Sequence, residues 1–379
     1  MHVLITVNAA WNVMNFRRPV LEGLIARRHR VTVLAPHDDK VADLQSLGAW
    51  YVPLTMDCRG LNPLRDAALI LRLFRQFRTV APDVVLSYTI KNNIFGALAA
   101  RWTGVPFIPN VSGLGTAFLS GGALQRVAET LYRMAFRKLD TVFFQNSEDR
   151  DLFVERRLVR PEQARLLPGS GIDLDRFAPT PLPEGPPTFL MIARLLRDKG
   201  VLEYVEAARQ VRASHPDVRF QLLGAADTEN RTAIGIEAVR EWQAEGAIDY
   251  LGTSTDVRPQ IAAATCVVLP SYREGAPRTL IEGAAMARPL IATDVPGCRS
   301  VVDRGRTGFL CEAKSPESLA EACRRFLALP REAQIAMGTA GRQKMEAEFD
   351  QKVVVAAYMD AIERVTSGRM DMSFSLAEN

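Results

Sequence analysis

The sequence predicts an α/β protein built from two parallel-sheet domains. With 379 residues, the chain is long enough for two domains of roughly 150–200 residues each. Short apolar segments that end in polar or glycine-containing loops alternate with helical patterns, as in proteins with parallel sheets. A proline-rich segment, PTPLPEGPP at 179–187, lies near the middle of the chain and predicts a linker.

These observations predict the domain boundaries. We expect a first Rossmann-like domain at residues 1–178 and a second at 188–350, facing each other across a cleft. Residues 351–379 are expected to form a C-terminal helix that returns to the first domain, followed by a frayed tail.

The composition indicates an ordinary globular protein. Hydrophobic residues make up 47% of the chain, and the mean hydropathy is close to zero. No segment approaches the ~18 consecutive apolar residues of a membrane span. Residues 1–7 predict a strand and not an export signal, and the five cysteines form no C-x-x-C pair. We therefore expect a cytoplasmic protein.

The charge is distributed unevenly along the chain. Residues 1–180 contain 23 basic and 16 acidic residues, whereas the remainder contains 24 and 27. A basic first half can bind nucleic acid, an anionic membrane surface or a phosphorylated substrate. The interleaved aromatic and basic residues of nucleic-acid modules are missing. We therefore expect a membrane surface or a phosphate, and no nucleic acid.

The most informative stretch is PSYREGAPRTLIEGAAMARPLIATDVPGCRSVVD at 270–303. An apolar run at 265–269 predicts a buried strand before it. A polar loop follows, and Pro277 suits the first turn of the next helix. Pro289 ends that helix and a second strand begins. In a parallel sheet, this helix would start at the crevice where ligands bind.

Two carboxylates flank the junction between this loop and the helix. Glu274 and Glu282 are separated by seven residues, so both can point into one crevice. Two structural alternatives stand beside a binding role. Thr279 and Glu282 also fit a capping box, T-x-x-E, and Glu274 could be a solvated loop residue.

The same residues resemble a family signature. The E-x7-E spacing, followed by PLIATDVPG at 289–297, resembles retaining glycosyltransferases of family 4, which have the GT-B fold. The resemblance implies that Glu282 binds the ribose of a nucleotide-sugar and that Glu274 orients the donor sugar. It also implies a donor site along the loop and helix start, at Gly275, Ala276, Pro277, Arg278 and Thr279.

The first predicted strand, residues 2–7, ends in a polar loop. Family members often have glycines there, to approach the donor diphosphate. This chain has Ala9 and Ala10 instead, and the resemblance assigns Asn8 to the donor site.

A helix is expected at residues 62–79. Its predicted apolar side contains Leu64, Ala68, Leu71 and Phe74. The arginines at 65, 72, 75 and 78 share another face, which is either simply solvated or attached to anionic lipid.

Three further strands, at 83–88, 107–110 and 141–144, end in polar or glycine-containing loops. These loops are either plain turns or part of one binding crevice. The sequences of these loops resemble those in the branch of family 4 that extends undecaprenyl-diphosphate-linked saccharides. That resemblance implies an acceptor site at Thr89, Lys91, Asn92, Ser112, Gly113 and Gly115. The apolar loop 117–122 could then meet the lipid.

The second domain begins after the linker. Residues 194–200, RLLRDKG, resemble the family's G-R-L-x-x-x-K-G, which implies that Arg194 and Lys199 neutralise the donor diphosphate. The alternative is a helix start with solvated basic residues. Asp173 and Asp175 form a D-x-D pattern in a position that the family does not use for metal. We expect no metal site and no cofactor apart from the co-substrate UDP-sugar.

The expected function is glycosyl transfer with retention of anomeric configuration. The expected donor is a UDP-sugar, and the sugar an N-acetylhexosamine. The expected acceptor is a polyprenyl-diphosphate-linked saccharide at the inner face of the cell membrane. Glu274, Arg194 and Lys199 are the expected catalytic residues.

Three alternative functions stand beside this one. A nicotinamide oxidoreductase would need G-x-G-x-x-G after a strand, which neither domain start provides. A lipid-binding module without activity would not need the paired acidic and basic sets. A nucleotide-sugar epimerase or hydrolase of the same fold stays open.

Overall fold

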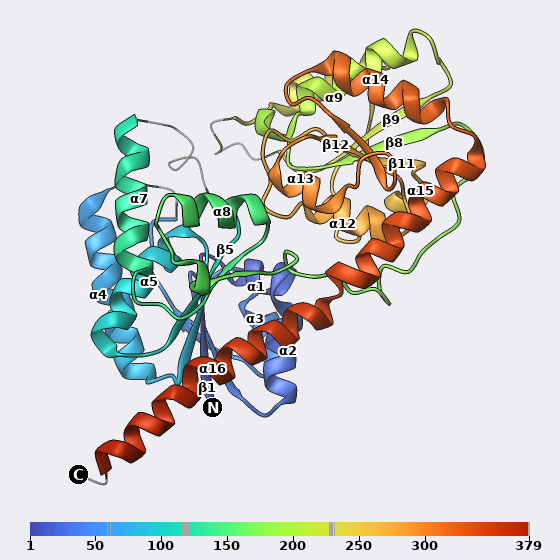
Figure 1. Cartoon of the computed structure of the whole chain (residues 1–379). Coiled ribbons are helices and arrows are strands. Elements are labelled where there is room, and N and C mark those ends of the chain that lie inside the picture. Colours follow the sequence, from blue (N-terminus) through green and yellow to red (C-terminus); the bar gives the residue numbers. More distant parts are fainter. Residues whose placement is uncertain (59, 61, 115–121, 227–229, 231, 378–379) are drawn as a thin grey trace. The chain divides into compact units, whose positions relative to one another are not determined.

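The computed structural model describes the chain except residues 59, 61, 115–121, 227–229, 231, 378 and 379; of 368–377 it describes the backbone. The chain forms two compact units (Figure 1). The first unit consists of Met1–Ser170 and Gln351–Asn379, and the second of Gly171–Asp350.

The first unit contains a seven-stranded parallel sheet in the order β3-β2-β1-β4-β5-β6-β7. The strand order reverses between β1 and β4, which are hydrogen-bonded neighbours. Most of these strands are buried along their length, because helices cover both faces of the sheet. The strands are β1 (His2–Thr6), β2 (Arg30–Ala35), β3 (Trp50–Pro53), β4 (Val84–Tyr88), β5 (Phe107–Val111), β6 (Val142–Phe144) and β7 (Ala164–Leu166).

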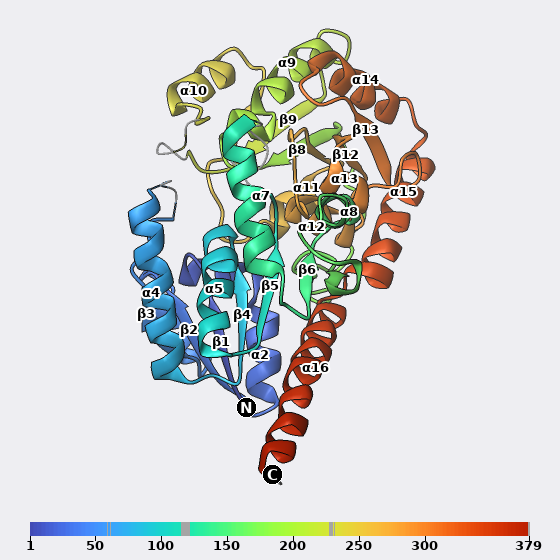
Figure 2. The same cartoon turned by 60° about the vertical axis from the view of Figure 1, so that its left-hand side comes forward.

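Two groups of helices cover this sheet (Figures 1 and 2). One face packs against α1 (Ala10–Phe16), α2 (Arg18–Ala26), α3 (Val41–Ser46) and α16 (Gln351–Ala377). The other face packs against α4 (Pro63–Val80), α5 (Ile90–Thr103), α7 (Gly122–Phe136) and α8 (Ser147–Glu155). On that face, α5 contacts both α4 and α7.

The predicted apolar side of α4 is wrong. The helix buries Leu69, Leu73 and Phe77, whereas Leu64 is 81% and Leu71 is 50% exposed. The helix has apolar residues on two opposite sides, and either could have faced the sheet. Packing in the core on this face of the sheet selected the side that contains Leu69, Leu73 and Phe77. The four arginines of α4 are exposed, as predicted.

The second unit repeats this topology with six parallel strands in the order β10-β9-β8-β11-β12-β13. Here the order reverses between β8 and β11. The strands are β8 (Thr188–Ile192), β9 (Arg219–Leu223), β10 (Asp249–Tyr250), β11 (Cys266–Leu269), β12 (Leu290–Thr293) and β13 (Gly308–Cys311). The helices are α9 (Val201–Arg212), α10 (Ile236–Ala244), α11 (Arg258–Ala263), α12 (Arg278–Ala285), α13 (Pro296–Val301), α14 (Pro316–Leu327) and α15 (Arg331–Lys344).

Residues 171–187, which include the predicted linker, belong to the second unit. Three arginines bind the backbone of this segment. The fully buried Arg288 donates to Thr180 O and Pro181 O, and Arg331 donates to Leu182 O. Arg342 donates to the carbonyl of Phe177. The unit boundary therefore lies after Ser170, and not at residue 178.

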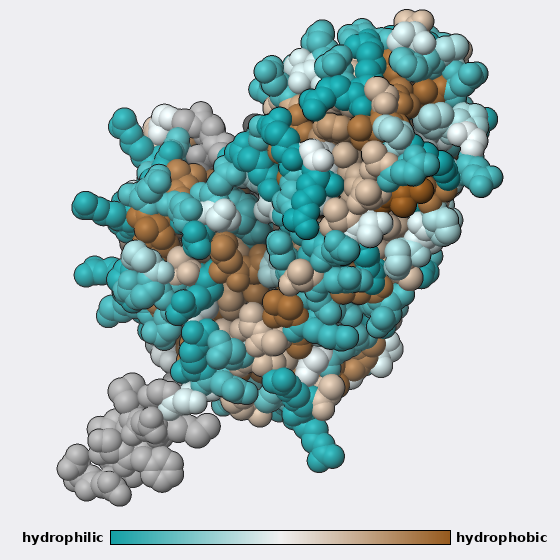
Figure 3. All heavy atoms as spheres, turned by 45° about the vertical axis from the view of Figure 1, so that its right-hand side comes forward, coloured by the Kyte–Doolittle hydropathy of each residue, from teal (hydrophilic) through white to brown (hydrophobic). Residues whose placement is uncertain are grey.

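In the part of the chain that the structure describes, no helix is both long and apolar enough to cross a membrane. On the face seen in Figure 3, hydrophilic residues surround separate apolar patches.

Candidate active site

The predicted donor-site residues gather at the topological switch point of the second sheet. Arg194 follows the end of β8 and Glu274 follows the end of β11, and these two strands are neighbours. Ligands of open α/β sheets bind in the crevice that the reversal of strand order creates. Two short segments therefore bring the predicted basic and acidic residues to one place.

Lys199 and Glu274 form an ion pair at this edge. Lys199 is the last residue of a short 3-10 helix, η2 (Arg197–Lys199), and its Nζ lies 2.5 Å from Glu274 Oε1. The two side chains are 24% and 12% exposed, so water screens their interaction only partly. The residue expected to bind diphosphate thus contacts the residue expected to orient the sugar.

Close backbone approaches hold the two segments in this position. Gly200 has φ +75°, and a Cβ there would lie 2.1 Å from the carbonyl oxygen of Pro270. The Tyr272 N–H donates to Asp198 O at 2.9 Å. A Cβ on Gly297 would lie 2.7 Å from Glu274 O. Glycine is therefore required at both positions to let the acidic loop pack against its neighbours.

Glu282 is not part of a capping box. Helix α12 begins at Arg278 with Pro277 as its N-cap, so Pro277 precedes the first turn. The Thr279 hydroxyl donates to Ile192 O at 3.0 Å, which ties α12 to the end of β8. The alternative that Glu282 only caps its own helix is therefore wrong.

Glu282 accepts a hydrogen bond from Arg278 Nε at 2.6 Å, one helical turn away. The Glu282 side chain is 10% exposed. Burial raises the pKa of Glu282, and the Arg278 guanidinium opposes this shift. The R-x3-E spacing is a sequence signal for this pair, although the resemblance assigned Arg278 only as a member of the donor loop.

The remaining predicted donor residues are split between the units. Gly275 and Ala276 are half-buried in the loop after Glu274, and Arg194 is exposed. Asn8 lies in the first unit, directly beyond β1, where its Oδ1 accepts from Asn12 Nδ2 at 3.4 Å.

The predicted acceptor residues lie at the carboxyl edge of the first sheet. Thr89 occupies the N-cap position of α5 with φ +73°, an uncommon conformation for a β-branched residue. Its hydroxyl donates to Asn92 Oδ1 at 3.0 Å, and Asn92 Nδ2 donates to Thr6 Oγ1 at 2.8 Å. Because Asn92 is fully buried, these bonds organise the turn between β4 and α5.

Lys91 is paired with a residue that the sequence analysis missed. Its Nζ lies 2.7 Å from Asp66 Oδ1 on α4, and the side chains are 14% and 19% exposed. The two residues are 25 positions apart, so no local pattern could have revealed the pair. A phosphate that binds Lys91 must therefore compete with Asp66.

The last three predicted acceptor positions come after β5 in the sequence. Ser112 is half-buried, and a Cβ on Gly113 would meet nothing within 4 Å. Gly115 and the segment 117–121 of the apolar loop lie outside the described residues.

Within the described ranges, no group of three or more His, Cys, Asp or Glu could hold a metal ion. Asp173 Oδ1 accepts from the backbone N–H groups of Asp175 and Arg176, so its carboxylate stabilises a turn.

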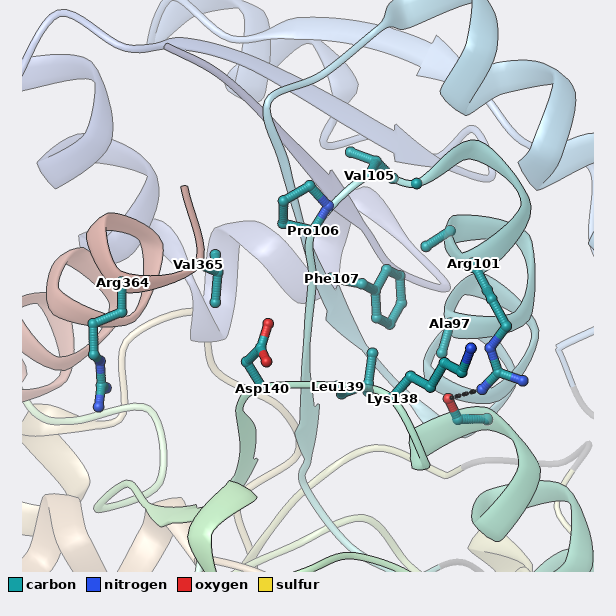
Figure 4. A pocket seen from close by; sticks show the side chains of 13 residues that line it. Ala97, Arg101, Val105, Pro106, Phe107, Lys138, Leu139, Asp140, Arg364 and Val365 are labelled. Atoms are coloured by element: carbon teal, nitrogen blue, oxygen red, sulfur yellow. Dashed lines mark hydrogen bonds between the residues drawn. The ribbon is translucent and has the colours of Figure 1, made fainter. Parts of the chain in front are cut away.

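A cavity of about 510 Å³ lies at the opposite edge of the first sheet (Figure 4). Pro106 and Phe107, at the start of β5, line it. The basic residues around it are Arg101 of α5, Lys138 just after α7, and Arg364 of α16. Because it lies at the amino ends of the strands, this cavity is separate from the predicted acceptor residues.

Comparisons with known proteins identify the two units. Residues 16–169 match the family described as glycosyl transferase 4-like domain, and residues 186–328 match glycosyl transferases group 1. The chain is 25% identical over 377 residues to the N,N'-diacetylbacillosaminyl-diphospho-undecaprenol alpha-1,3-N-acetylgalactosaminyltransferase of Campylobacter jejuni, covering 94% of this chain and 97% of the relative. It is also 25% identical over 291 residues to the UDP-Gal:alpha-D-GlcNAc-diphosphoundecaprenol alpha-1,3-galactosyltransferase of Escherichia coli, covering 73% and 74%.

Solved structures show the same fold. A glycosyltransferase from Rickettsia africae superposes with a TM-score of 0.77 at 19% identity, covering 96% of this chain and 98% of that one. HepE from Anabaena, in complex with UDP, superposes with a TM-score of 0.78 at 17% identity, covering 96% and 100%. The prediction of two Rossmann-like domains is confirmed. A glycosyl transferase 4-like domain is followed by a domain of glycosyl transferases group 1. The chain therefore belongs to the glycosyltransferases of the GT-B fold.

Proposed function

We propose that this glycosyltransferase moves a sugar, an N-acetylhexosamine, from a UDP-sugar to a polyprenyl-diphosphate-linked saccharide. The contact between Lys199 and Glu274 is the observation that supports a nucleotide-sugar as the donor. A nucleotide-sugar has its diphosphate and its sugar joined at one oxygen. A cation and a carboxylate in contact suit the two sides of that junction.

Each donor-site residue has one role in this proposal. Arg194 and Lys199 bind the diphosphate and stabilise the negative charge that it gains as it leaves. Glu274 accepts hydrogen bonds from the sugar hydroxyls, and Glu282 accepts them from the ribose. Because two cations neutralise the diphosphate, the reaction is proposed to need no metal ion, and turnover should persist in EDTA.

The proposed stereochemistry is retention. The bond between the anomeric carbon and the diphosphate oxygen breaks, and the acceptor hydroxyl bonds to that carbon on the same face. The proton of the acceptor hydroxyl passes to the departing diphosphate, so the reaction requires no side-chain nucleophile.

The names of the relatives support the acceptor half. Both relatives are named as transferases that act on sugars linked to undecaprenyl diphosphate. At 25% identity, these names support the class of acceptor, a saccharide linked to polyprenyl diphosphate, but they do not identify the saccharide.

The deciding experiment is a screen of UDP-sugars for UDP release, with and without a polyprenyl-diphosphate-linked saccharide. We expect release only when both substrates are present. Turnover of a UDP-sugar alone would favour the epimerase or hydrolase alternative, which the named relatives do not support.

Glu282→Gln is expected to weaken donor binding roughly tenfold, because a charged acceptor becomes a neutral one. Glu274→Gln is expected to reduce kcat more than it weakens donor binding. Calorimetric titration with the UDP-sugar and steady-state kinetics measure the two effects. Glu22→Gln is a matched control, because Glu22 forms an exposed pair with Arg18 at the same helical spacing. Unchanged donor affinity in Glu282→Gln would contradict the ribose role.

We further propose that the first unit docks on the anionic inner face of the cell membrane. Exposed Leu64 and Leu71 lie among the exposed arginines of α4. Helix α7 exposes Leu124, Val127 and Met134, together with Arg126 and Arg133. Helices α4, α5 and α7 lie side by side on one face of the sheet (Figure 2). Basic and apolar side chains on neighbouring helices suit a surface of anionic lipid.

Arg72, Arg75 and Arg78 changed together to glutamate are expected to abolish sedimentation with anionic liposomes. Each basic residue near such a surface contributes about 1 kcal/mol, and salt screens the attraction. Wild-type binding should therefore fall between low and high salt. Changing Arg219, Arg240 and Arg306 of the second unit to glutamate alters the net charge equally and should leave binding intact. Equal loss in both triple variants would contradict docking through α4.

A further inference from the structure

A buried arginine in the first unit has no partner for its charge among the residues that the structure describes. Arg17 joins α1 to α2, and it is only 4% exposed. Its Nε and Nη1 are buried without a hydrogen-bond partner, and it forms no ion pair with any residue that the structure describes. Buried charges are normally paired, because removing them from water is costly. An unpaired one therefore requires an explanation.

The contact that Arg17 does make is with an aromatic ring. Its Cζ lies 4.4 Å from the ring centroid of Tyr88, and this cation–π attraction offsets part of the desolvation. Tyr88 is 1% exposed, and its hydroxyl makes no well-formed hydrogen bond, although Tyr358 lies beside it. Burial raises the pKa of Tyr88 well above its ordinary value, so the hydroxyl keeps its proton. Among the described residues, Arg17 and Tyr88 together thus present donors without a well-formed acceptor.

Both residues lie at the switch point of the first sheet. Helix α1 begins shortly after β1 and leads into Arg17, and Tyr88 is the last residue of β4. β1 and β4 are the neighbours between which the strand order reverses. This is the position in the first unit that corresponds to Arg194 and Glu274 in the second, and it is where open α/β sheets bind ligands.

The helix ends at this position also favour an anion. Helix α2 begins at Arg18, immediately after Arg17. Helix α5 begins at Ile90, two residues after Tyr88. Neither helix has a side-chain cap on its first backbone N–H groups. Such groups carry partial positive charge and favour negatively charged ligands.

We propose that Arg17 and Tyr88 bind a phosphate oxyanion, and that this oxyanion belongs to the diphosphate of the lipid-linked acceptor. An oxyanion supplies both the negative charge that Arg17 lacks and the acceptor that Tyr88 lacks. Lys91, three residues after Tyr88, provides a second cation once Asp66 releases it. The assignment to the acceptor rests on the proposed function, whereas the oxyanion site itself does not.

The test is binding of inorganic pyrophosphate to the full chain in saturating UDP, which occupies the proposed donor site. Arg17→Met is expected to bind pyrophosphate roughly tenfold or more weakly than wild type, because it lacks the charge-assisted bonds. Arg17→Lys, which keeps the charge, is expected to lie between the two. Arg18→Met is the matched control, because Arg18 is exposed and paired with Glu22. Wild-type affinity in Arg17→Met would overturn the site.

Thermal unfolding provides an independent readout. Without an anion, the Arg17→Met variant is expected to unfold at the wild-type temperature or above it, because an uncompensated buried charge has been removed. It is also expected to lose the rise in Tm that pyrophosphate produces in wild type. A lower Tm with an unchanged pyrophosphate effect would indicate a structural arginine and overturn the proposal.

Two further measurements distinguish a wrong assignment of the oxyanion to the acceptor from a wrong proposed function. Titration with UDP alone should give wild-type affinity in Arg17→Met, and weakened UDP binding would overturn the assignment to the acceptor. In this variant, sugar transfer should show a raised KM for the lipid-linked acceptor. Normal transfer kinetics would overturn the assignment of the oxyanion to the acceptor, while the proposed function would stand. If pyrophosphate binding depends on Arg17 but wild type transfers no sugar to that acceptor, the oxyanion site stands and the proposed function fails.

Discussion

Lys199→Ala is expected to reduce kcat by roughly 10- to 100-fold with the proposed donor and acceptor. A charge-assisted hydrogen bond contributes about 1.5–3 kcal/mol, and each 1.4 kcal/mol of lost transition-state stabilisation is about tenfold in rate. The diphosphate gains negative charge as it leaves, so the contact is stronger in the transition state than with bound donor. The loss should therefore appear in kcat and not only in KM.

The contact with Glu274 makes the variant more damaging than loss of a diphosphate contact alone. Lys199 and Glu274 are 2.5 Å apart, and the Glu274 side chain is only 12% exposed. Removing the cation leaves a poorly hydrated carboxylate next to the diphosphate, where it repels the developing charge. We expect Arg194→Ala, which keeps both members of this pair, to lose a similar or smaller factor.

Arg209→Ala is the matched control for these two variants. Arg209 belongs to the same unit and pairs with Glu206 and Glu245, but all three side chains are more than 40% exposed. Steady-state kinetics at saturating donor should show wild-type turnover for it. If Lys199→Ala and Arg194→Ala both turned over at near-normal rates, these residues would have no part in the mechanism.

Arg288→Met is expected to lower the Tm of the second unit by roughly 6–20 °C, which corresponds to a destabilisation of about 3–5 kcal/mol. Arg288 is fully buried and is one of the largest side chains in the interior. It donates to Ile261 O and Ala262 O of α11, and to Thr180 O and Pro181 O of the proline-rich segment. The variant would leave these four carbonyls, one buried and three partly buried, without their donor.

The two opposing effects of this substitution can be compared. Burial lowers the pKa of Arg288 to about 10, so the guanidinium is still charged at neutral pH and its desolvation is costly. Methionine removes that cost. A buried carbonyl that loses its partner costs about 1–3 kcal/mol, however, and Arg288 serves one buried and three partly buried carbonyls. We therefore expect the loss of hydrogen bonds to dominate.

Two variants test whether the geometry of Arg288 matters. Arg288→Lys should be almost as unstable as Arg288→Met, because a single ammonium cannot reach both segments. Arg306→Met should change stability by no more than about 0.5 kcal/mol, because the Arg306 side chain is 70% exposed. A Tm within about 2 °C of wild type for Arg288→Met would mean that the proline-rich segment is held by other contacts.

The sequence by itself determined the fold class and the loops that form the candidate donor site. Apolar strands that end in polar loops predicted parallel sheets, and the structure contains two of them in the same order. The motif at 270–303 is contiguous, so its strand, loop and helix follow from local patterns alone. The short spacing made Glu274 and Glu282 candidates without long-range information, and the resemblance to the family then implied their binding roles.

The tertiary structure decided which of several locally equivalent possibilities applies. Glu282 fitted a capping box by spacing, but the Thr279 hydroxyl bonds Ile192 O on another element instead. Helix α4 had two apolar sides, and packing against the sheet buried the one that the sequence analysis had not chosen. Both outcomes depend on neighbours that lie far away in the chain.

Charge pairs between distant elements, and buried unpaired groups, could not have been predicted from the sequence either. Lys199 and Glu274 are 75 residues apart, and Lys91 and Asp66 are 25 apart on different helices. The sequence contains Arg17 beside Arg18 without any sign that one is buried and the other exposed. Which charges meet, and which stay unpaired, is set by burial and by distances between elements. Both quantities exist only once the sheets have assembled.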